Sequence, residues 1–553
     1  MLRNTKLPHL ALLALSLFWL SCSTGKHSFT KKDVKGSEKL IGLDFSKKNI
    51  DTLYPYLERN LSGFDSLRKY PLENDVFPAV RFDPVPFGFT MPEQLDGNDW
   101  NIPDYIEVPE RFDDLAFYTI PQLASLIKHQ KITSTELTQF FLARLKKYQP
   151  TLQCSISITD SLALAQAKRA DEEIKQGKYR GILHGIPYGT KDLMAVPGYT
   201  TTWGAEPYKN QVINQTATVI QKLEDAGAVL VAKLVSGSLA RGDVWFGGKT
   251  KNPWDITQGA TGSSAGSGSA TSAGLVPFAL GTETLGSITS PSTRNGVTGL
   301  RPTYGRVSRY GVMSLSWSMD KVGPLARNAE DCAIVFSVIQ GEDKNDLTTK
   351  NLPFGVDWTK DVKSLKVAYL KKDIEKDTTD TGDNLRNALK VLKEMGIEPI
   401  EVELPEDVPY RGFDIILRAE AGAFFDELVR SGEVDLMVEQ DQRSRANSLR
   451  QSRFIPAVEY LQANRQRQVL MQKMENLMKD YDVLISPSFG NDQLLATNLT
   501  GHPVIAIPTG LDKKNHPTSM TFVGKLYDEA SILLLAKAFQ DHSEFDELHP
   551  PRY

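Results

Sequence analysis

Apolar and polar positions recur along this chain with helical spacing in some segments and as short apolar runs in others. Between residues 119 and 148 the apolar positions follow a helical period, which predicts two helices. The second is expected to begin at Thr133, which forms a capping-box pattern with Glu136. Its predicted apolar face carries Leu137, Phe140, Phe141 and Leu145. A third helix is expected at residues 161–177, an alanine-rich segment that ends in glycine.

Farther along, short apolar runs alternate with helical patterns. The expected helices cover residues 218–226, 384–395 and 457–479, and the expected strands cover residues 228–234, 365–370, 397–404, 481–487 and 501–508. Such alternation predicts an α/β fold, in which helices flank a sheet.

The first 22 residues have the pattern of an export signal. Arg3 and Lys6 precede the apolar run 10–20, which is too short for a comfortable membrane span. The junction of Ser21 and Cys22 resembles a bacterial lipoprotein cleavage site, which implies a lipid on Cys22. A cleaved signal without lipid and an uncleaved anchor are the alternatives. We therefore expect an exported protein, held in the cell envelope through an N-terminal lipid anchor, with its folded domain outside the cytoplasm.

Composition suggests how the rest of the chain is organised. Residues 23–42 are rich in Lys, Ser and Gly and carry too few apolar side chains to fold, so a flexible tether is expected. Residues 43–115 are rich in aromatic residues and proline, and are expected to form an N-terminal extension that packs over the main domain. The main domain is expected to span residues 116–545.

Composition also excludes several kinds of partner. The chain has 553 residues, of which 41% are hydrophobic and 24% are charged, as in ordinary globular proteins. Its net charge of −4 gives no basic field for a nucleic acid. Its three cysteines show neither a disulfide framework nor the spacing of metal ligands. We therefore expect no nucleic-acid partner, no metal and no cofactor. The oligomeric state is left open.

Residues 258–302 are unusually rich in Gly, Ser, Thr and Ala. Small residues allow backbone to pass very close to its neighbours or to adopt positive φ. They also bring hydroxyls and unhindered N–H groups together, as a serine nucleophile and an oxyanion hole require. A flexible Gly/Ser linker is the alternative. The apolar insert at residues 273–280 argues against it, because a solvated linker would not carry one.

This stretch resembles the signature of the amidase signature family. The matching elements are Gly262-Ser263-Ser264-Ala265-Gly266-Ser267, the apolar insert, Gly286-Ser287-Ile288 and residues 296–311. Ser263 and Ser287 are 24 residues apart, which is the family's spacing. Residues 181–192 resemble the element that supplies the family's catalytic lysine, here Lys191. The resemblance extends from about residue 118 to about residue 540. It implies a central mixed sheet with helices on both faces.

The resemblance also implies hydrolysis of an amide in a small molecule. Ser287 would attack the carbonyl carbon and form an acyl-enzyme, Ser263 would relay its proton, and neutral Lys191 would be the final base. The family holds the relaying serine with a cis peptide bond. The oxyanion hole would consist of the backbone N–H groups of Thr284, Leu285, Gly286 and Ser287. Ser264 would support these groups without reacting, and no cofactor is implied.

Two residues depart from the family pattern, and three other interpretations are open. Leu285 stands where the family has glycine and Thr289 where it has arginine, so no particular substrate is carried over. Residues 262–266 also satisfy G-x-S-x-G, the motif of an esterase with Ser264 as nucleophile and a downstream histidine. A catalytic His184 is disfavoured, since it belongs to the turn of the lysine motif. A non-catalytic binding protein is possible, as is the related amidotransferase that amidates misacylated tRNA. The export signal and the absence of a basic field argue against the amidotransferase.

Overall fold

The computed structural model describes residues 29–100, 102–489 and 491–553. The chain divides into two compact units, one that ends at Leu72 and one that spans Glu73–Tyr553. In these described ranges we find no helix with both the length and the apolar character needed to cross a bilayer. Cys22 and the expected export signal lie outside the described residues.

The described part of the first unit is helical where the composition predicted a flexible tether. Helix α1 (Lys31–Ser37) and the 3₁₀ helix η1 (Glu38–Ile41) precede helix α2 (Lys47–Leu67). Thr30 and Asp33 form a capping box at the start of α1. The ammonium of Lys31 lies 2.7 Å from the Asp51 carboxylate of α2. The prediction of an unstructured segment is therefore wrong for residues 31–41, because local caps and ion pairs supply order that apolar content alone does not indicate.

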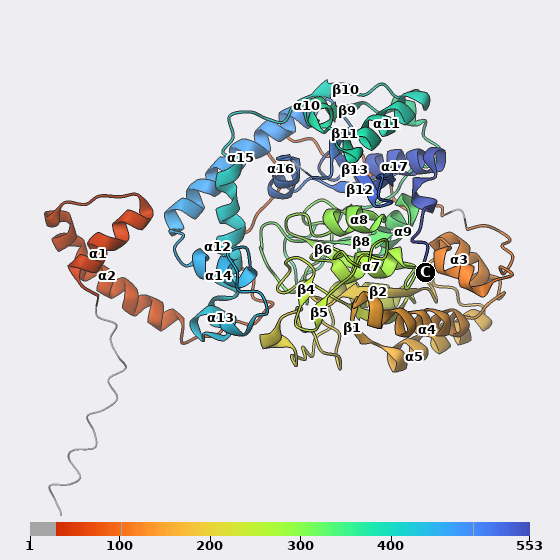
Figure 1. Ribbon diagram of the computed structural model, residues 1–553, viewed down its shortest axis with the longest axis horizontal. Helices are drawn as coiled ribbons and strands as arrows, with labels where there is room; N and C mark the ends of the chain where they lie inside the picture. Colours follow the sequence, from red (N-terminus) through yellow and green to blue (C-terminus); the bar gives the residue numbers. More distant parts are fainter. Residues whose placement is uncertain (1–28, 101, 490) are drawn as a thin grey trace, which may run out of the picture. The chain divides into compact units, whose positions relative to one another are not determined.

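Eleven strands in the described part of the second unit form one mixed sheet (Figure 1). Their order is β1-β3-β2-β6-β8-β7-β12-β13-β11-β9-β10. Their bounds are β1 (Ser155–Ile158), β2 (Pro187–Lys191), β3 (Val229–Leu234), β6 (Phe278–Glu283), β7 (Thr298–Arg301), β8 (Lys321–Ala326), β9 (Val367–Leu370), β10 (Ile400–Val402), β11 (Val483–Pro487), β12 (Val504–Leu511) and β13 (Pro517–Gly524). Strand β2 is parallel to both β3 and β6, whereas β6 and β8 are antiparallel. A separate hairpin joins β4 (Val244–Trp245) to β5 (Gly248–Lys249).

Helices surround this sheet (Figure 1). They are α3 (Ile120–Lys128), α4 (Ser134–Leu152), α5 (Asp160–Lys175), α6 (Thr218–Asp225), α7 (Ala265–Ser272), α8 (Thr289–Asn295), α9 (Ala329–Ile339), α10 (Lys371–Lys376), α11 (Asp380–Glu394), α12 (Asp414–Phe424), α13 (Asp426–Arg430), α14 (Arg445–Ser452), α15 (Ala457–Met478), α16 (Gln493–Thr500) and α17 (Glu529–Ser543). The predicted α/β fold is confirmed. The predicted helices and strands are present, with ends that differ by a few residues, and the capping box of Thr133 and Glu136 begins α4.

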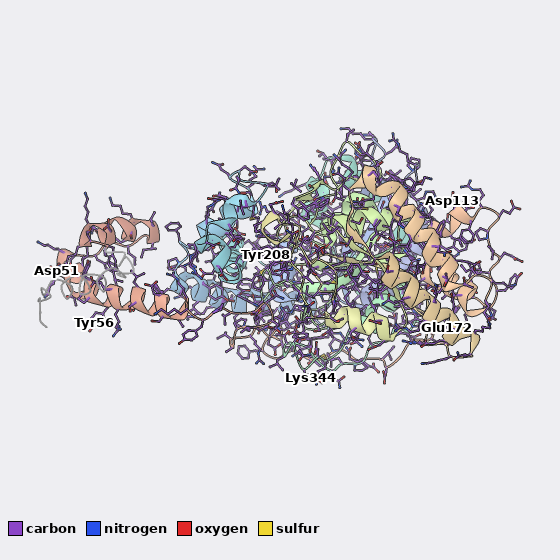
Figure 2. All side chains as sticks on the ribbon, turned by 90° about the horizontal axis from the view of Figure 1, so that it is seen from below. Asp51, Tyr56, Asp113, Glu172, Tyr208 and Lys344 are labelled. Carbon is purple, nitrogen blue, oxygen red and sulfur yellow. The ribbon has the colours of Figure 1, made fainter. Side chains whose placement is uncertain are left out.

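Strand β3 shows how the sheet is buried on both faces. Val229 and Val231 pack in one apolar cluster with side chains of α4, α5 and α7. Leu230, which points to the opposite face, packs in another cluster with side chains of α6 and α9. Every residue of β3 is buried. Charged side chains such as Asp113, Glu172 and Lys344 lie at the surface instead (Figure 2).

Residues 73–111 cross the second unit with almost no regular secondary structure. The ring of Phe82 packs 5.0 Å from that of Tyr304, and its face lies 3.5 Å from the guanidinium carbon of Arg467. Farther along, the amide of Gln94 donates a hydrogen bond to the Tyr527 carbonyl. This half of the predicted extension therefore lies on the second unit, whereas residues 43–72 belong to the first.

Candidate active site

Lys191 is the last residue of β2, an inner strand of the sheet in which every residue is buried. Its Nζ lies 2.8 Å from Ser263 Oγ, 3.1 Å from Ser264 Oγ and 2.9 Å from Thr282 Oγ1. Burial lowers the pKa of Lys191 well below 10.5, although Asp320 and Glu283 oppose this shift. A buried amine that contacts only hydroxyls is suited to remain neutral and to accept a proton.

Ser263 follows a cis peptide bond, Gly262–Ser263, as the resemblance implies. Its side chain is fully buried, and its carbonyl accepts a hydrogen bond from the N–H of Gly237. A Cβ added to Gly262 would lie 1.9 Å from the carbonyl oxygen of Gly242, so only glycine fits at this position. The loop at residues 237–242 therefore packs directly on the turn that carries Ser263.

The small residues after this turn form α7, whose eight residues are all buried. A Cβ on Gly266 would lie 2.2 Å from the carbonyl oxygen of Cys154 and 2.3 Å from the backbone nitrogen of Val235. The flexible-linker alternative is therefore wrong. The small side chains let α7 approach the backbone of its neighbours, as predicted for this stretch.

Ser264 lies behind Lys191 and holds β6. Its hydroxyl donates to the carbonyl of Thr282 and accepts from the N–H of Thr282, both at 3.2 Å. No hydrogen bond joins Ser264 to a histidine in the described part of the chain, and the residue is fully buried. His502 pairs with Thr500, and His516 lies beside Gln258. The structure therefore does not support the esterase interpretation, which requires Ser264 to react and a histidine to activate it.

Ser287 lies on the turn between β6 and α8. Its carbonyl accepts a hydrogen bond of 3.2 Å from the N–H of Ser264, so the two serine-bearing turns touch. Its hydroxyl forms no hydrogen bond within the described residues and is 8% exposed. In the same part of the chain, none of the N–H groups of the predicted oxyanion hole donates to another protein group: Thr284, Leu285, Gly286 and Ser287. These four N–H groups are available to a developing oxyanion.

Both departures from the family pattern have a visible place. Leu285 has negative φ, whereas Gly286 has a φ of 88°, so the turn takes its left-handed residue at the glycine. The Leu285 side chain lines the pocket in front of Ser287. Thr289 donates its N–H and its hydroxyl to the carboxylate of Glu283.

Glu283 is a site residue whose role the sequence did not indicate. Its carboxylate accepts the N–H groups of Ile288 and Thr289, directly after Ser287. It also pairs with Arg301 at 2.6 Å and accepts a hydrogen bond from Asn498. Burial alone would raise the pKa of Glu283, but Arg301 and these donors lower it to about 2. The ionised carboxylate therefore fixes the turn that carries Ser287.

Asp320 and Thr282 were also missed. Asp320 accepts a hydrogen bond from Thr284 Oγ1 and the N–H groups of Leu315 and Ser316, so it holds the other end of the oxyanion turn. Thr282 shares Lys191 with the two serines. The only signal for Thr282 was a polar residue near the end of an apolar strand, five residues before Ser287.

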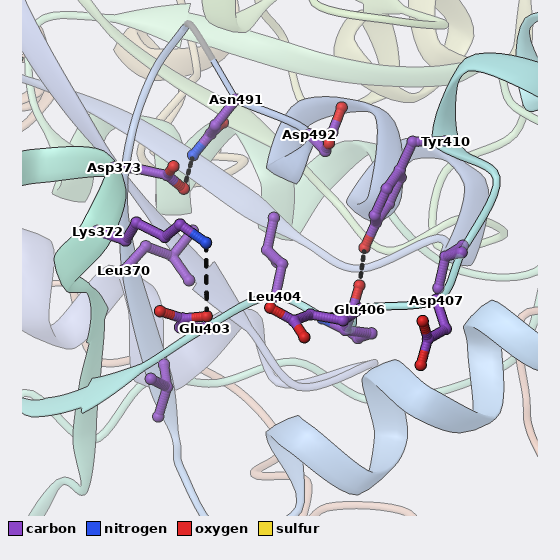
Figure 3. A pocket seen from close by; sticks show the side chains of 13 residues that line it. Leu370, Lys372, Asp373, Glu403, Leu404, Glu406, Asp407, Tyr410, Asn491 and Asp492 are labelled. Carbon is purple, nitrogen blue, oxygen red and sulfur yellow. Dashed lines mark hydrogen bonds and ion pairs between the residues drawn. The ribbon is translucent and has the colours of Figure 1, made fainter. Parts of the chain in front are cut away.

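A pocket of about 410 Å³ opens in front of Ser287. Its wall includes Gly262, Thr284 and Leu285, together with residues of the 240–242 loop, α12 and α14. Another pocket, of about 560 Å³, lies beside β9 and β10 and contains none of the predicted site residues (Figure 3). In it Asn491 donates to Asp373, and Lys372 lies 3.8 Å from Glu403. In the described part of the chain, no three His, Cys, Asp or Glu side chains are grouped as metal ligands.

The fold and this site define a hydrolase that acts on carbon–nitrogen bonds. The chain belongs to the amidase signature family, because the family model described as Amidase matches residues 136–533. It is 32% identical over 479 residues to the A-type subunit of the glutamyl-tRNA(Gln) amidotransferase of Coxiella burnetii, covering 78% of this chain and 99% of the relative. The corresponding protein of Acinetobacter baumannii is 31% identical over 486 residues, covering 78% and 97%.

Solved structures agree on the fold. The native peptide amidase of Stenotrophomonas maltophilia superposes with a TM-score of 0.70 at 25% identity, covering 79% of this chain and 98% of the amidase. Residues before about 116 lie outside the family match, so the first unit is an addition to the family domain.

Proposed function

We propose that this protein hydrolyses an amide bond of a small molecule through an acyl-enzyme, with Ser287 as nucleophile, Ser263 as proton relay and Lys191 as base. The observation that carries the proposal is the contact of 2.8 Å between Lys191 Nζ and Ser263 Oγ, on a turn that is hydrogen-bonded to Ser287. An amide carbonyl is a poor electrophile, so both an activated hydroxyl and oxyanion stabilisation are needed.

The hydrogen bonds around Lys191 favour a proton path through Ser263. The single hydroxyl proton of Ser264 is donated to the Thr282 carbonyl, so Ser264 must accept from Lys191. A neutral amine has two N–H groups and one lone pair. If Ser264 and Thr282 take the two N–H groups, the lone pair faces Ser263. Ser263 can then pass a proton from Ser287 to the lysine and later return it to the leaving amine.

The reaction follows from these positions. The Ser287 oxygen bonds to the carbonyl carbon while its proton moves through Ser263 to Lys191. The carbonyl oxygen then carries negative charge near the free N–H groups of residues 284–287. The C–N bond breaks as the amine takes a proton, and water, activated by the same path, releases the acid.

Labelling with a fluorophosphonate, followed by mass spectrometry, tests this assignment. We expect the adduct on Ser287, which lines the pocket, and none on the Ser287→Ala variant. An adduct on Ser264 would favour the esterase. A folded protein with no adduct would favour a binding function.

One observation favours a second candidate. The curated relatives at 31–32% identity are amidotransferase subunits, which by name act on glutamyl-tRNA. If this chain shared that role, amide cleavage would require partner proteins and tRNA. The isolated chain should be assayed against primary and secondary amides. Turnover by the chain alone supports the amidase, whereas turnover only with tRNA and partner proteins supports the amidotransferase.

A further inference from the structure

The pocket in front of Ser287 has an unusual charge for a site of this size. Four arginines line it, namely Arg241, Arg418, Arg443 and Arg445, against the single carboxylate of Asp414. Asp414 pairs with Arg418 one helical turn away, so these two charges offset each other. Three cations are left to face the pocket.

Arg445 is fixed in the wall of the pocket. It is 5% exposed, and it donates from Nε to the Leu239 carbonyl at 3.1 Å and from Nη2 to the Ala240 carbonyl at 3.2 Å. Its Nη1 donates to no group in the described residues. Leu239 and Ala240 both have positive φ, so the arginine holds an unusual loop conformation and still presents part of its guanidinium to the cavity.

Arg241 follows this loop and is partly buried. Its neighbour Gly242 packs against Gly262, so Arg241 is close to the catalytic turn. Its guanidinium has no hydrogen bond or ion pair within the described part of the chain. Burial and the charge of Arg241 together lower the pKa of Arg445 to about 9, while Asp320 and Asp414 oppose this shift. The other nearby carboxylate is Glu439, whose pKa is raised by burial and lowered in part by Arg241.

The backbone adds to the same field. Helix α14 begins at Arg445, with Ser444 as N-cap and Ser444 and Ser448 in the pocket wall. Within the described residues, the N–H groups of Arg445 and Ala446 have no hydrogen-bond acceptor. A helix N-terminus carries partial positive charge and binds anions. Two guanidiniums and this N-terminus converge on one small cavity, and bringing like charges together in a buried wall costs stability unless an anion joins them.

Building on the proposed function, we infer that the substrate carries a carboxylate, which Arg241 and Arg445 bind while the amide carbonyl faces Ser287. A guanidinium binds a carboxylate through two parallel hydrogen bonds, so the pair would orient the amide as well as attract it. The volume of about 410 Å³ suits a compact amide. Leu285, Leu315 and Leu417 provide apolar wall for the carbon chain between the two groups.

Two matched probe pairs test this inference and locate the carboxylate. Succinyl 4-nitroanilide carries it on the acyl half, and butyryl 4-nitroanilide replaces it with a methyl group. On the amine half, 4-butyramidobenzoate is compared with 4-butyramidotoluene. We expect kcat/KM to favour the carboxylate at least tenfold in one pair. Arg241→Gln should reduce that ratio toward one, and Arg241→Lys should restore part of it. Arg411→Gln, which alters an exposed arginine outside the pocket, should leave the ratio intact.

The outcomes separate this inference from the proposed function. Equal or inverse preference in both pairs, or a ratio that survives Arg241→Gln, overturns the carboxylate and leaves the amidase in place. If no probe is turned over, the readout is the rate at which a fluorophosphonate labels Ser287. Glutarate should slow labelling of the wild type more than that of Arg241→Gln, and equal rates with and without glutarate overturn the inference. Absence of any label on Ser287 overturns the proposed function itself.

Discussion

Lys191 Nζ and Ser263 Oγ lie 2.8 Å apart, although 72 residues of chain separate them. The contact brings the end of an inner strand to the turn before α7, and both partners are fully buried. The lysine therefore has hydroxyl partners in place of an ion pair, and its pKa is lowered by burial.

The first prediction concerns pH. The neutral lysine is the working form, so kcat/KM should fall as pH falls through the lowered pKa of Lys191 and should level off above it. Lys191→Arg should be nearly as inactive as Lys191→Ala, because a guanidinium stays charged at any accessible pH. A pH profile of the wild type and single rates for both variants are the measurement. Substantial activity of the arginine variant would mean that a fixed positive charge suffices.

The three serines should differ in a graded way. Ser287→Ala should lower kcat by about 10⁴-fold or more, since no other group can carry the acyl intermediate. Ser263→Ala should be severe but less complete, because water can bridge part of the proton path. Ser264→Ala should mainly lower the free energy of unfolding, by about 1–3 kcal/mol, because Thr282 N–H and Lys191 lose a partner. Steady-state kinetics and urea unfolding of each variant check this order, which an active Ser287→Ala variant would refute.

The Glu283–Arg301 pair gives a prediction on stability. Glu283→Gln leaves Arg301 buried and unpaired, so we expect a loss of about 3–5 kcal/mol in the free energy of unfolding. The folded pKa of about 2 lies below the usual 4.5, so this carboxylate stabilises the fold above about pH 4.5 and loses its effect as pH falls toward 2. The double variant Glu283→Gln, Arg301→Met removes both charges and should recover part of the loss. A double variant less stable than the single one would contradict this account.

How much of the site could be predicted depends on how local its signals are. Lys191, Ser263 and Ser287 lie in short elements of recognisable spacing, and the structure places all three around one pocket wall. Glu283 gains its role from Arg301 and from Asn498, which is 215 residues away. Such a partner is set by the order of strands in the sheet, which local periodicity does not contain. The helix at residues 31–37 was missed for the opposite reason, because a single capping box decides it.

The first 22 residues support a proposal on localisation. We propose that the protein is exported and that Cys22 carries a lipid, on the basis of the Ser21-Cys22 junction and the apolar run before it. Expressed in a bacterium, the wild type should lose its first 21 residues and sediment with membranes. Cys22→Ser should shift the protein to the soluble fraction. Membrane association that survives this substitution would rule out the lipid anchor.

Leu285 is the place where this chain departs from its family in the pocket itself. Its side chain occupies space in front of Ser287 that a glycine would leave open, and its φ is one that any residue accepts. Leu285→Gly should therefore widen the pocket without straining the turn, and should raise kcat/KM for longer acyl groups relative to short ones by about tenfold or more. The measurement is kcat/KM over a series of 4-nitroanilides of increasing acyl length, with Leu285→Ala as an intermediate. The added glycine also loosens the oxyanion turn, so the absolute rates should fall for every substrate. A uniform fall with an unchanged length profile would show that Leu285 positions the turn and leaves substrate choice to other residues.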